Sequence, residues 1–237
     1  SGAGLVTAST GADAIASLRG AGADVLGPVL LVAGLSVFAG LAPLHAWTAE
    51  NAALAPHGVG AVAALAARIG AYVVLVRVAG ALIAGDSAVA QTTGAALAAV
   101  GAVSALVGAA QALGAQDLRR LAAHALTAQF GVGLISLSTG SEDGFTAALF
   151  TAAAGAVTTL ALLVGATASR PQLGVATPIA ALDGLALSRP LIAAALGVTA
   201  FGLTGAPLTA AFLGKWLSVE AALARGFRAF VALPLRL

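Results

Sequence analysis

The segment at residues 42–48, APLHAWT, interrupts an apolar run that begins near residue 25. Proline lacks a backbone donor, and its ring breaks a helix. Inside a bilayer, broken backbone is tolerated only where protein or water satisfies the freed polar groups. Arg68 follows within the next apolar stretch, and a charge at that depth faces a bundle interior or a water path. The chain is therefore expected to fold as a helix bundle that encloses polar groups.

Composition places these apolar stretches in a membrane. The 237 residues are 60% hydrophobic and 8% charged, whereas a soluble domain carries about 25% charged residues. Such a chain cannot cover a water-facing surface, so a polytopic membrane protein is expected. The chain has no cysteine, which excludes disulfides and cysteine-ligated iron–sulfur clusters. It has no basic cluster beyond Arg119 and Arg120, so we expect no nucleic-acid partner.

The predicted fold is all-α, a single transmembrane domain over residues 1–237 with about six full spans and a partial helix at each end. Two of the spans are predicted to be broken helices, at about 25–53 and 190–224. The other expected helices cover about 59–84, 88–114, 118–138 and 145–168, and residues 226–237 are expected to begin a further helix. Each full span is long enough for the roughly 20 residues that cross a bilayer.

The loops divide by charge. The loops at 115–120 and 169–189 are expected on one side and hold four arginines, whereas Asp86, Glu142 and Asp143 lie in the opposite loops. By the positive-inside rule, the arginine side faces the cytoplasm or the mitochondrial matrix.

An internal echo connects the two predicted breaks. Residues 42–46, APLHA, resemble residues 206–210, APLTA, and both follow a glycine-containing apolar run. Two broken helices in corresponding places indicate a transporter-like inverted repeat. Coincidence in an alanine-rich chain is the alternative interpretation.

Lys215 and Arg68 are the strongest candidates for a role in proton transfer, because deep charges cost about 2.5 kcal/mol or more to insert. A desolvated lysine can lose its proton near neutral pH, whereas arginine cannot. Arg77 is predicted to be an interfacial anchor. His124, Gln111 and Gln129 are polar residues in apolar helices, where they either bond neighbouring helices or extend a proton path. For His124 an interfacial role is equally open.

No redox site is expected in this chain. It has no dinucleotide fingerprint, no P-loop and only three histidines, so neither a cofactor nor a metal is predicted here.

Three blocks resemble the antiporter-like subunits of respiratory complex I. Residues 42–56 resemble the family pattern "PFHxWTPD…GAPTP", residues 117–124 resemble "xxKRLLAYSS", and residues 203–216 resemble "LAGIPPTAGFxGKF". The blocks occur in the family's order over about residues 1–224. Two further features resemble the N-type subunit, called NADH dehydrogenase subunit 2 in mitochondria. Trp47 is followed by Thr48, and the expected helix at 145–168 contains Thr158 and Thr159 but no lysine.

The resemblance implies a complex I subunit that takes part in proton translocation coupled to quinone reduction. Lys215 matches the lysine of the second broken helix, and Arg68 occupies the position of the central-axis lysine. His45 matches the histidine after the first break, and Gln129 stands where the family has a helical histidine. NADH, FMN, iron–sulfur clusters and ubiquinone are expected in other subunits, and other membrane-arm subunits and membrane lipids are the expected partners.

The sequence also departs from the family pattern. Phe38 stands at the lysine position of the first broken helix and cannot titrate. The family's essential glutamate lies on an earlier helix that has no counterpart here, and the chain resembles a form truncated at both ends. Either another polypeptide supplies those helices or the subunit is reduced.

Two alternatives remain open at this stage. One is a subunit of a Mrp-type cation/proton antiporter or membrane-bound hydrogenase, and the other is a structural subunit that has lost proton conduction. The absence of methionine, together with the high alanine content, predicts a processed, imported chain. We therefore expect the mitochondrial inner membrane, with the bacterial plasma membrane as the alternative.

Overall fold

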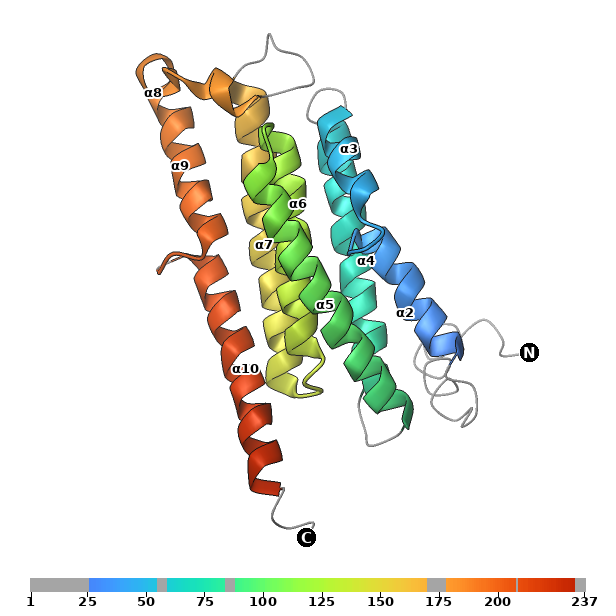
Figure 1. Ribbon diagram of the computed structural model, residues 1–237. Coiled ribbons are helices and arrows are strands. Elements are labelled where there is room, and N and C mark those ends of the chain that lie inside the picture. The colour runs from blue at the N-terminus through green and yellow to red at the C-terminus, as the bar shows by residue number, and fades with distance from the viewer. Residues whose placement is uncertain (1–25, 55–58, 84–87, 170–177, 208, 233–237) are drawn as a thin grey trace, which may run out of the picture.

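The computed structural model describes residues 26–54, 59–83, 88–169, 178–207 and 209–232. Within these ranges the chain forms helices and one isolated β-bridge, which joins Asp117 to Pro178 (Figure 1). The predicted all-α class is confirmed. The helices lie roughly side by side as a bundle.

The elements follow one another with short connections. In chain order they are α2 (Leu26–Ala39), α3 (Ala46–Leu54), α4 (Val59–Ile83), α5 (Ala88–Gly114), α6 (Leu118–Leu137), α7 (Glu142–Ser169), the 3₁₀ turn η2 (Ile179–Leu182), α8 (Leu185–Ser188), α9 (Pro190–Thr204) and α10 (Ala210–Ala232). The expected new helix at residue 226 was wrong, because α10 continues without a break to Ala232. Gly226 is tolerated within a helix that other residues propagate.

Three helices in the described ranges are long and apolar enough to cross a membrane alone: Val62–Ile83, Ala88–Gly114 and Glu142–Ser169. The first halves of the broken helices, within α2 and α9, are shorter apolar helices. Short halves are expected where one span is split in two.

The helix α6 is long enough to span but carries Arg119, Arg120, His124 and Gln129. It packs against α5, α7, α3 and α10, and most of its side chains are buried. The neighbouring helices therefore bury Arg119 and Gln129, whereas Arg120 stays exposed near the start of α6. Ionisable residues in membrane segments face the bundle interior in this way.

Glycine allows α5 and α6 to approach closely. A Cβ atom added to Gly131 on α6 would lie 2.5 Å from the Ala105 backbone nitrogen of α5. One added to Gly108 on α5 would lie 2.6 Å from the Ala128 nitrogen. In lipid, where the hydrophobic effect does not drive helices together, small residues at such interfaces allow close backbone packing that does.

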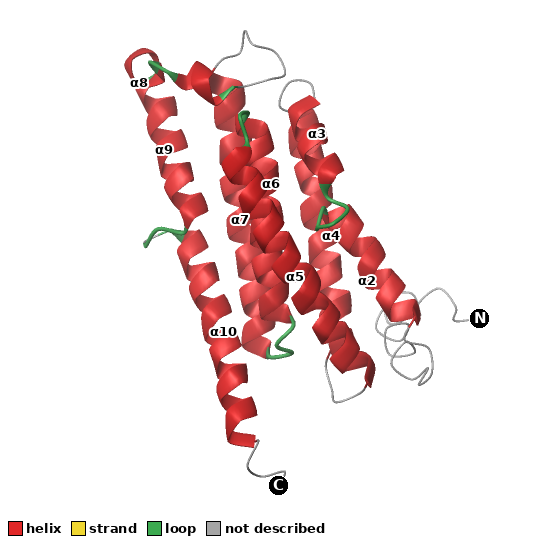
Figure 2. Cartoon of the chain, in the orientation of Figure 1, coloured by secondary structure: helices red, strands yellow, loops and turns green. Residues whose placement is uncertain are grey.

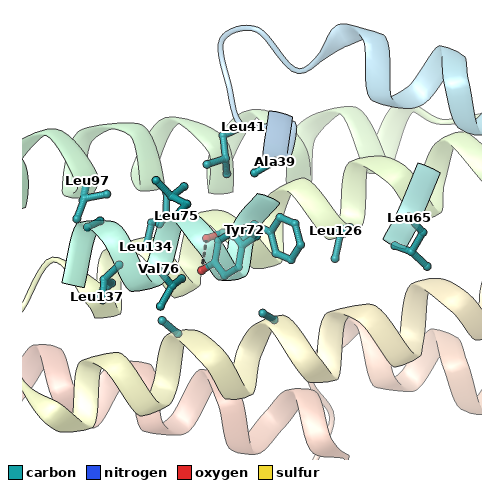
Figure 3. Packing of buried hydrophobic residues seen from close by; sticks show 14 of the residues in the cluster. Ala39, Leu41, Leu65, Tyr72, Leu75, Val76, Leu97, Leu126, Leu134 and Leu137 are labelled. Carbon is teal, nitrogen blue, oxygen red and sulfur yellow. Dashed lines mark hydrogen bonds between the residues drawn. The ribbon is translucent and has the colours of Figure 1, made fainter. Parts of the chain in front are cut away.

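An aromatic pair joins α4 to α6 at the centre of the core. The rings of Tyr72 and Phe130 stack with centroids 4.0 Å apart, and both side chains are fully buried. The Tyr72 hydroxyl donates to the Phe130 carbonyl at 3.2 Å. Figure 3 shows Tyr72 among leucines from several helices, with this hydrogen bond dashed. The tyrosine thus keeps its polar end satisfied inside the bundle.

The loops predicted to lie on the arginine side meet at one end of the bundle. Besides the Asp117–Pro178 bridge, the Ile179 nitrogen donates to the Gln116 carbonyl at 2.9 Å. Arg189, at the start of α9, donates to the Ala168 carbonyl near the end of α7 at 2.7 Å. This end of the bundle is therefore held together by contacts between loops.

We expect Gly131→Ala to destabilise the bundle, because its methyl group would meet α5 backbone, and overpacking costs about 1–3 kcal/mol. Gly70→Ala is the matched control: a Cβ there meets nothing within 4 Å, and helix propensity favours alanine. The free energy of unfolding of the two variants in detergent micelles distinguishes them. Equal stability would contradict the packing argument.

Candidate functional site

The first helix break is built by Gly40. The residue has φ +73°, a left-handed conformation that glycine adopts without strain. Its nitrogen donates to the Val37 carbonyl at 3.0 Å, and the Leu41 nitrogen donates to Ser36 at 2.9 Å. This pair of bonds is a Schellman motif, which ends α2. Pro43 follows and prevents α2 from continuing.

The second break repeats this geometry. Gly205 has φ +75°, its nitrogen donates to Gly202 at 3.2 Å, and the Ala206 nitrogen donates to Phe201 at 3.2 Å. Pro207 follows, as Pro43 does at the first break. The sequence echo between the two segments therefore reflects one backbone motif used twice.

The two broken helices run in opposite directions. In Figure 1, α2 and α3 rise through the bundle, whereas α9 and α10 descend. Figure 2 shows a loop interrupting each pair. Opposed broken helices are the arrangement that an inverted repeat produces.

Arg68 reaches the first break from α4. The side chain is 4% exposed, and its Nε donates to the Ala39 carbonyl at 3.2 Å. Its Nη1 donates to the Ala123 carbonyl at 3.2 Å, and its Nη2 donates to the Thr127 hydroxyl at 2.9 Å. The guanidinium thus binds α2, α4 and α6 together.

The partners of Arg68 are carbonyl and hydroxyl oxygens rather than carboxylates. Ala39 is the last residue of α2, where unpaired carbonyls and the negative end of the helix dipole favour a cation. The Thr127 hydroxyl also donates to the Gly40 carbonyl at 3.1 Å. A Cβ on Gly40 would lie 2.9 Å from Arg68 Nε, so glycine is required both for the turn and for the close approach.

Lys215 occupies the equivalent place at the second break. Its Nζ donates to the carbonyls of Leu203 and Thr204 at 3.2 and 2.9 Å, which are the last residues of α9. A Cβ on Gly205 would lie 2.8 Å from that Nζ. Each break therefore brings a cation to the carbonyl end of its first half-helix. Lys215 comes from α10 itself, whereas Arg68 comes from a separate helix.

The structure brings Gln129 and Lys215 to the same cavity. A volume of about 550 Å³ lies between α5, α6, α9 and α10, and both residues line it. Gln129 is 5% exposed, and neither its Oε1 nor its Nε2 has a hydrogen-bond partner among the described residues. Buried polar groups of this kind are commonly satisfied by internal water.

Gln129 stands beside a polar face of α7. A Cβ on Gly155 would lie 2.7 Å from Gln129 Oε1, and Thr151 and Thr159 are one turn before and after Gly155. Both hydroxyls are buried and have no partner among the described residues. Thr151 was not singled out in the sequence, and Thr159 was quoted there only within the Thr158–Thr159 pair that carries the resemblance.

His45 lies just after the first break and is 5% exposed. Its Nε2 is 2.5 Å from Gln111 Oε1 on α5, and its Nδ1 is 3.3 Å from the Pro43 carbonyl. His45 therefore connects the break to α5. It belongs to the Arg68 half of the site, apart from the cavity that Gln129 and Lys215 share.

The structure also places Phe38 and Arg77, which the sequence analysis had singled out. Phe38, at the family's lysine position, is 70% exposed on the outer face of α2. Arg77 is exposed on α4, in keeping with a predicted anchor. Sequence reasoning missed Thr127, which bonds both Arg68 and Gly40. Its only signal is its place one turn after His124.

The family model and the curated relatives that match this chain agree on one family. The family model described as NADH:quinone oxidoreductase/Mrp antiporter, TM, matches residues 7–235. The chain is 33% identical over 207 residues to NADH-quinone oxidoreductase subunit N 2 of Syntrophobacter fumaroxidans, covering 86% of this chain and 42% of that protein. It is 30% identical over 225 residues to subunit N 1 of Solidesulfovibrio magneticus, covering 94% and 48%.

A third relative is NADH-quinone oxidoreductase subunit N of Azorhizobium caulinodans, 32% identical over 199 residues, with 84% of this chain and 41% of that protein covered. The chain thus spans less than half the length of these curated relatives.

We expect Thr127→Val to destabilise the first break. The change keeps the side-chain shape but removes the hydroxyl shared by Arg68 and Gly40, and leaving buried partners unpaired costs about 1–3 kcal/mol. Thr92→Val on α5 is the control, because among the described residues that exposed hydroxyl bonds the Ala88 carbonyl of its own turn. Denaturant titration in micelles measures both; an unchanged Thr127→Val midpoint would refute the bridging role.

Proposed function

The chain belongs to the NADH:quinone oxidoreductase/Mrp antiporter transmembrane family, and we propose that it is an N-type membrane-arm subunit of complex I. Its proposed role is proton translocation coupled to quinone reduction elsewhere in the complex. The three curated relatives carry the name NADH-quinone oxidoreductase subunit N, which supports this assignment. The chain acts as part of a translocating enzyme, with the redox steps in other subunits.

The observation that carries the proposal is Lys215 at the second break. Its ammonium group binds the carbonyl end of α9 and lines a cavity of about 550 Å³. A lysine ammonium can release a proton when water or a polar partner reaches it, whereas an arginine cannot. We assign Lys215 as the residue that takes up and releases the transported proton.

We propose an electrostatic role for Arg68 at the first break. Arginine stays protonated in proteins, so Arg68 provides a fixed positive charge that clamps the first break. Gln129 lines the cavity with Lys215, and its amide atoms have no hydrogen-bond partner among the described residues, so we propose that it holds water there. His45 is proposed to do the same beside the first break.

The proposed partners are the other membrane-arm subunits and membrane lipids. NADH, FMN, iron–sulfur clusters and ubiquinone are proposed to act in other subunits. The curated relatives are bacterial, which favours the bacterial plasma membrane over the mitochondrial inner membrane as the location.

A second candidate is a subunit of a Mrp-type cation/proton antiporter, because the family description includes these transporters. The subunits that co-purify with this chain separate the two. Flavin and quinone-site subunits favour complex I, whereas a set of antiporter subunits with Na⁺-dependent transport favours the alternative.

We expect Lys215→Ala to lower the ratio of protons translocated to electrons transferred in vesicles that contain the whole complex. Lys215→Arg should fail in the same way, because arginine keeps the charge but cannot release the proton. Proton uptake and quinone reduction are measured together.

Arg77→Ala is the control, because it removes a cation from the exposed face of α4 and should leave the ratio unchanged. If Lys215→Arg translocates protons like the wild type, only the charge is needed and the proton-carrying role is wrong. If Lys215→Ala also leaves stoichiometry and turnover unchanged, the chain is a structural subunit.

A further inference from the structure

The cavity that Gln129 and Lys215 share is a groove on the outer surface of the bundle. Its volume is about 550 Å³, with α5 on one side, α9 and α10 on the other, and α6 side chains between them. Leu113 on α5 is 90% exposed at its rim, and Ala200 on α9 is also exposed. Figure 1 shows α9 and α10 at one edge of the bundle. The mouth of the groove therefore faces outward from this chain, toward lipid in a bilayer.

Small apolar side chains line most of this groove. They recur about one turn apart on two of its walls, as Ala105, Ala109 and Ala112 on α5, and Ala125 and Ala128 on α6. The α6 wall covers residues 121–132 and is about 17 Å long at the rise of an α-helix. That length is close to half of the roughly 30 Å hydrocarbon core of a bilayer, which is the depth of one lipid leaflet. The groove therefore matches a single acyl chain in length and chemistry.

The donors of the groove lie toward its deep end. Lys215 follows the second break, which Figure 2 shows about midway along the α9–α10 pair. Its ammonium group donates to the carbonyls of Leu203 and Thr204 and keeps a third hydrogen for another acceptor. Gln129 is 5% exposed, and its amide nitrogen has no partner among the described residues. A ligand in the groove can thus accept hydrogen bonds from two side chains on different helices.

The positive charge of Lys215 has no counterion in the part of the chain that the structure describes. The salt bridge found there joins Arg120 to Glu50, near the start of α6. A cation that borders lipid without a counterion is costly, and an anion in the groove lowers that cost. The apolar groove between α2 and α5 is the comparison within this molecule, because none of its described lining residues is charged. Charge complementarity therefore favours an anionic amphiphile in the Lys215 groove.

We propose that the groove binds a long-chain fatty acid, whose carboxylate contacts Lys215 and the Gln129 amide while its acyl chain lies along the alanines of α5 and α6. A carboxylic acid is neutral in an apolar medium, so it can reach the middle of the bilayer. The phosphodiester of a phospholipid keeps its charge and stays at the interface. In the groove the acid gives its proton to the neutral Lys215 amine. The resulting carboxylate and ammonium are then joined by a charge-assisted hydrogen bond.

An occupied groove changes the behaviour of Lys215. The bound carboxylate favours the charged form of the amine, and the acyl chain displaces water from beside Gln129. The fatty acid is therefore an inhibitor of proton exchange at the second break. This consequence rests on the proposed function, whereas the binding itself does not.

The test measures binding to the whole membrane complex in nanodiscs of zwitterionic phospholipid. A photoreactive palmitic acid is cross-linked to the complex, its sites are mapped by mass spectrometry, and palmitate and hexadecanol are compared as competitors. We expect cross-links on the α5 and α9 walls. Palmitate should compete at least about tenfold better than hexadecanol, because the alcohol has the same chain but no charge to pair with Lys215.

Two results of this experiment overturn the proposal. Equal competition by hexadecanol shows that the acyl chain alone is recognised and that Lys215 does not pair with a carboxylate. Absence of cross-links in the groove, as expected if a neighbouring protein helix covers it, shows that no fatty acid binds there.

Variants separate the charge from the shape of the groove. Lys215→Gln keeps a polar side chain without the charge and should weaken palmitate labelling about tenfold, whereas Lys215→Arg keeps the charge and should retain labelling. Ala109→Leu fills the groove and should abolish labelling. Ala110→Leu is the matched control, because this exposed neighbour does not line the groove, and it should label like the wild type. Wild-type labelling in Lys215→Gln or in Ala109→Leu contradicts the proposed binding mode.

The Lys215→Ala variant separates this proposal from the proposed function. If labelling depends on Lys215 while Lys215→Ala leaves the proton-to-electron ratio unchanged, the fatty-acid site stands and the proton-carrying role is wrong. If Lys215→Ala lowers the ratio while palmitate leaves the groove unlabelled, the proposed function stands and the fatty-acid site is wrong.

Discussion

The structure depends on satisfying the carbonyl oxygens freed where two helices break inside a bundle. In an apolar environment an unpaired backbone carbonyl costs several kcal/mol, so each break needs a donor. Arg68 supplies it at the end of α2, and Lys215 supplies it at the end of α9. At each break a glycine with positive φ makes the turn and leaves room for the cation. The glycine turn and the position of the cation therefore depend on each other at each break.

The two breaks meet this constraint in chemically different ways. Arg68 comes from another helix and spreads its donors over α2 and α6, which makes the first break a clamp with a permanent charge. Lys215 belongs to the half-helix that follows its own break and borders a cavity. Its compact ammonium holds two carbonyls and has an ionisable proton. The asymmetry fits the separate tasks that we propose for the two halves of the bundle: anchoring at the first break and proton exchange at the second.

Much of this fold could be predicted from sequence because its signals are local. The length of the apolar runs predicted the helices. Glycine followed by proline predicted both breaks, since each of these residues acts on its own backbone. The contacts across helices were less accessible. The local signal of Thr127 is only its place one turn after His124, because its role depends on Arg68 reaching it from α4. The grouping of Gln129 with Lys215, and of His45 with Gln111, depends on helix packing, which periodicity does not encode in so uniformly apolar a chain. The end of α10 was misplaced because a glycine resembles a boundary.

The glycine contact between α5 and α6 has a mechanical meaning. Because the two backbones are in direct contact, neither helix can slide past the other without first separating. The α5–α6 pair is therefore the rigid part of the bundle. The breaks at Gly40 and Gly205 are instead the places where φ can change without a Cβ clash. At the second break, loss of the Lys215 proton would weaken the hold on the α9 carbonyls, whereas Arg68 keeps its charge at the first break. A movement coupled to the charge of Lys215 is therefore expected at the second break rather than at the centre of the bundle.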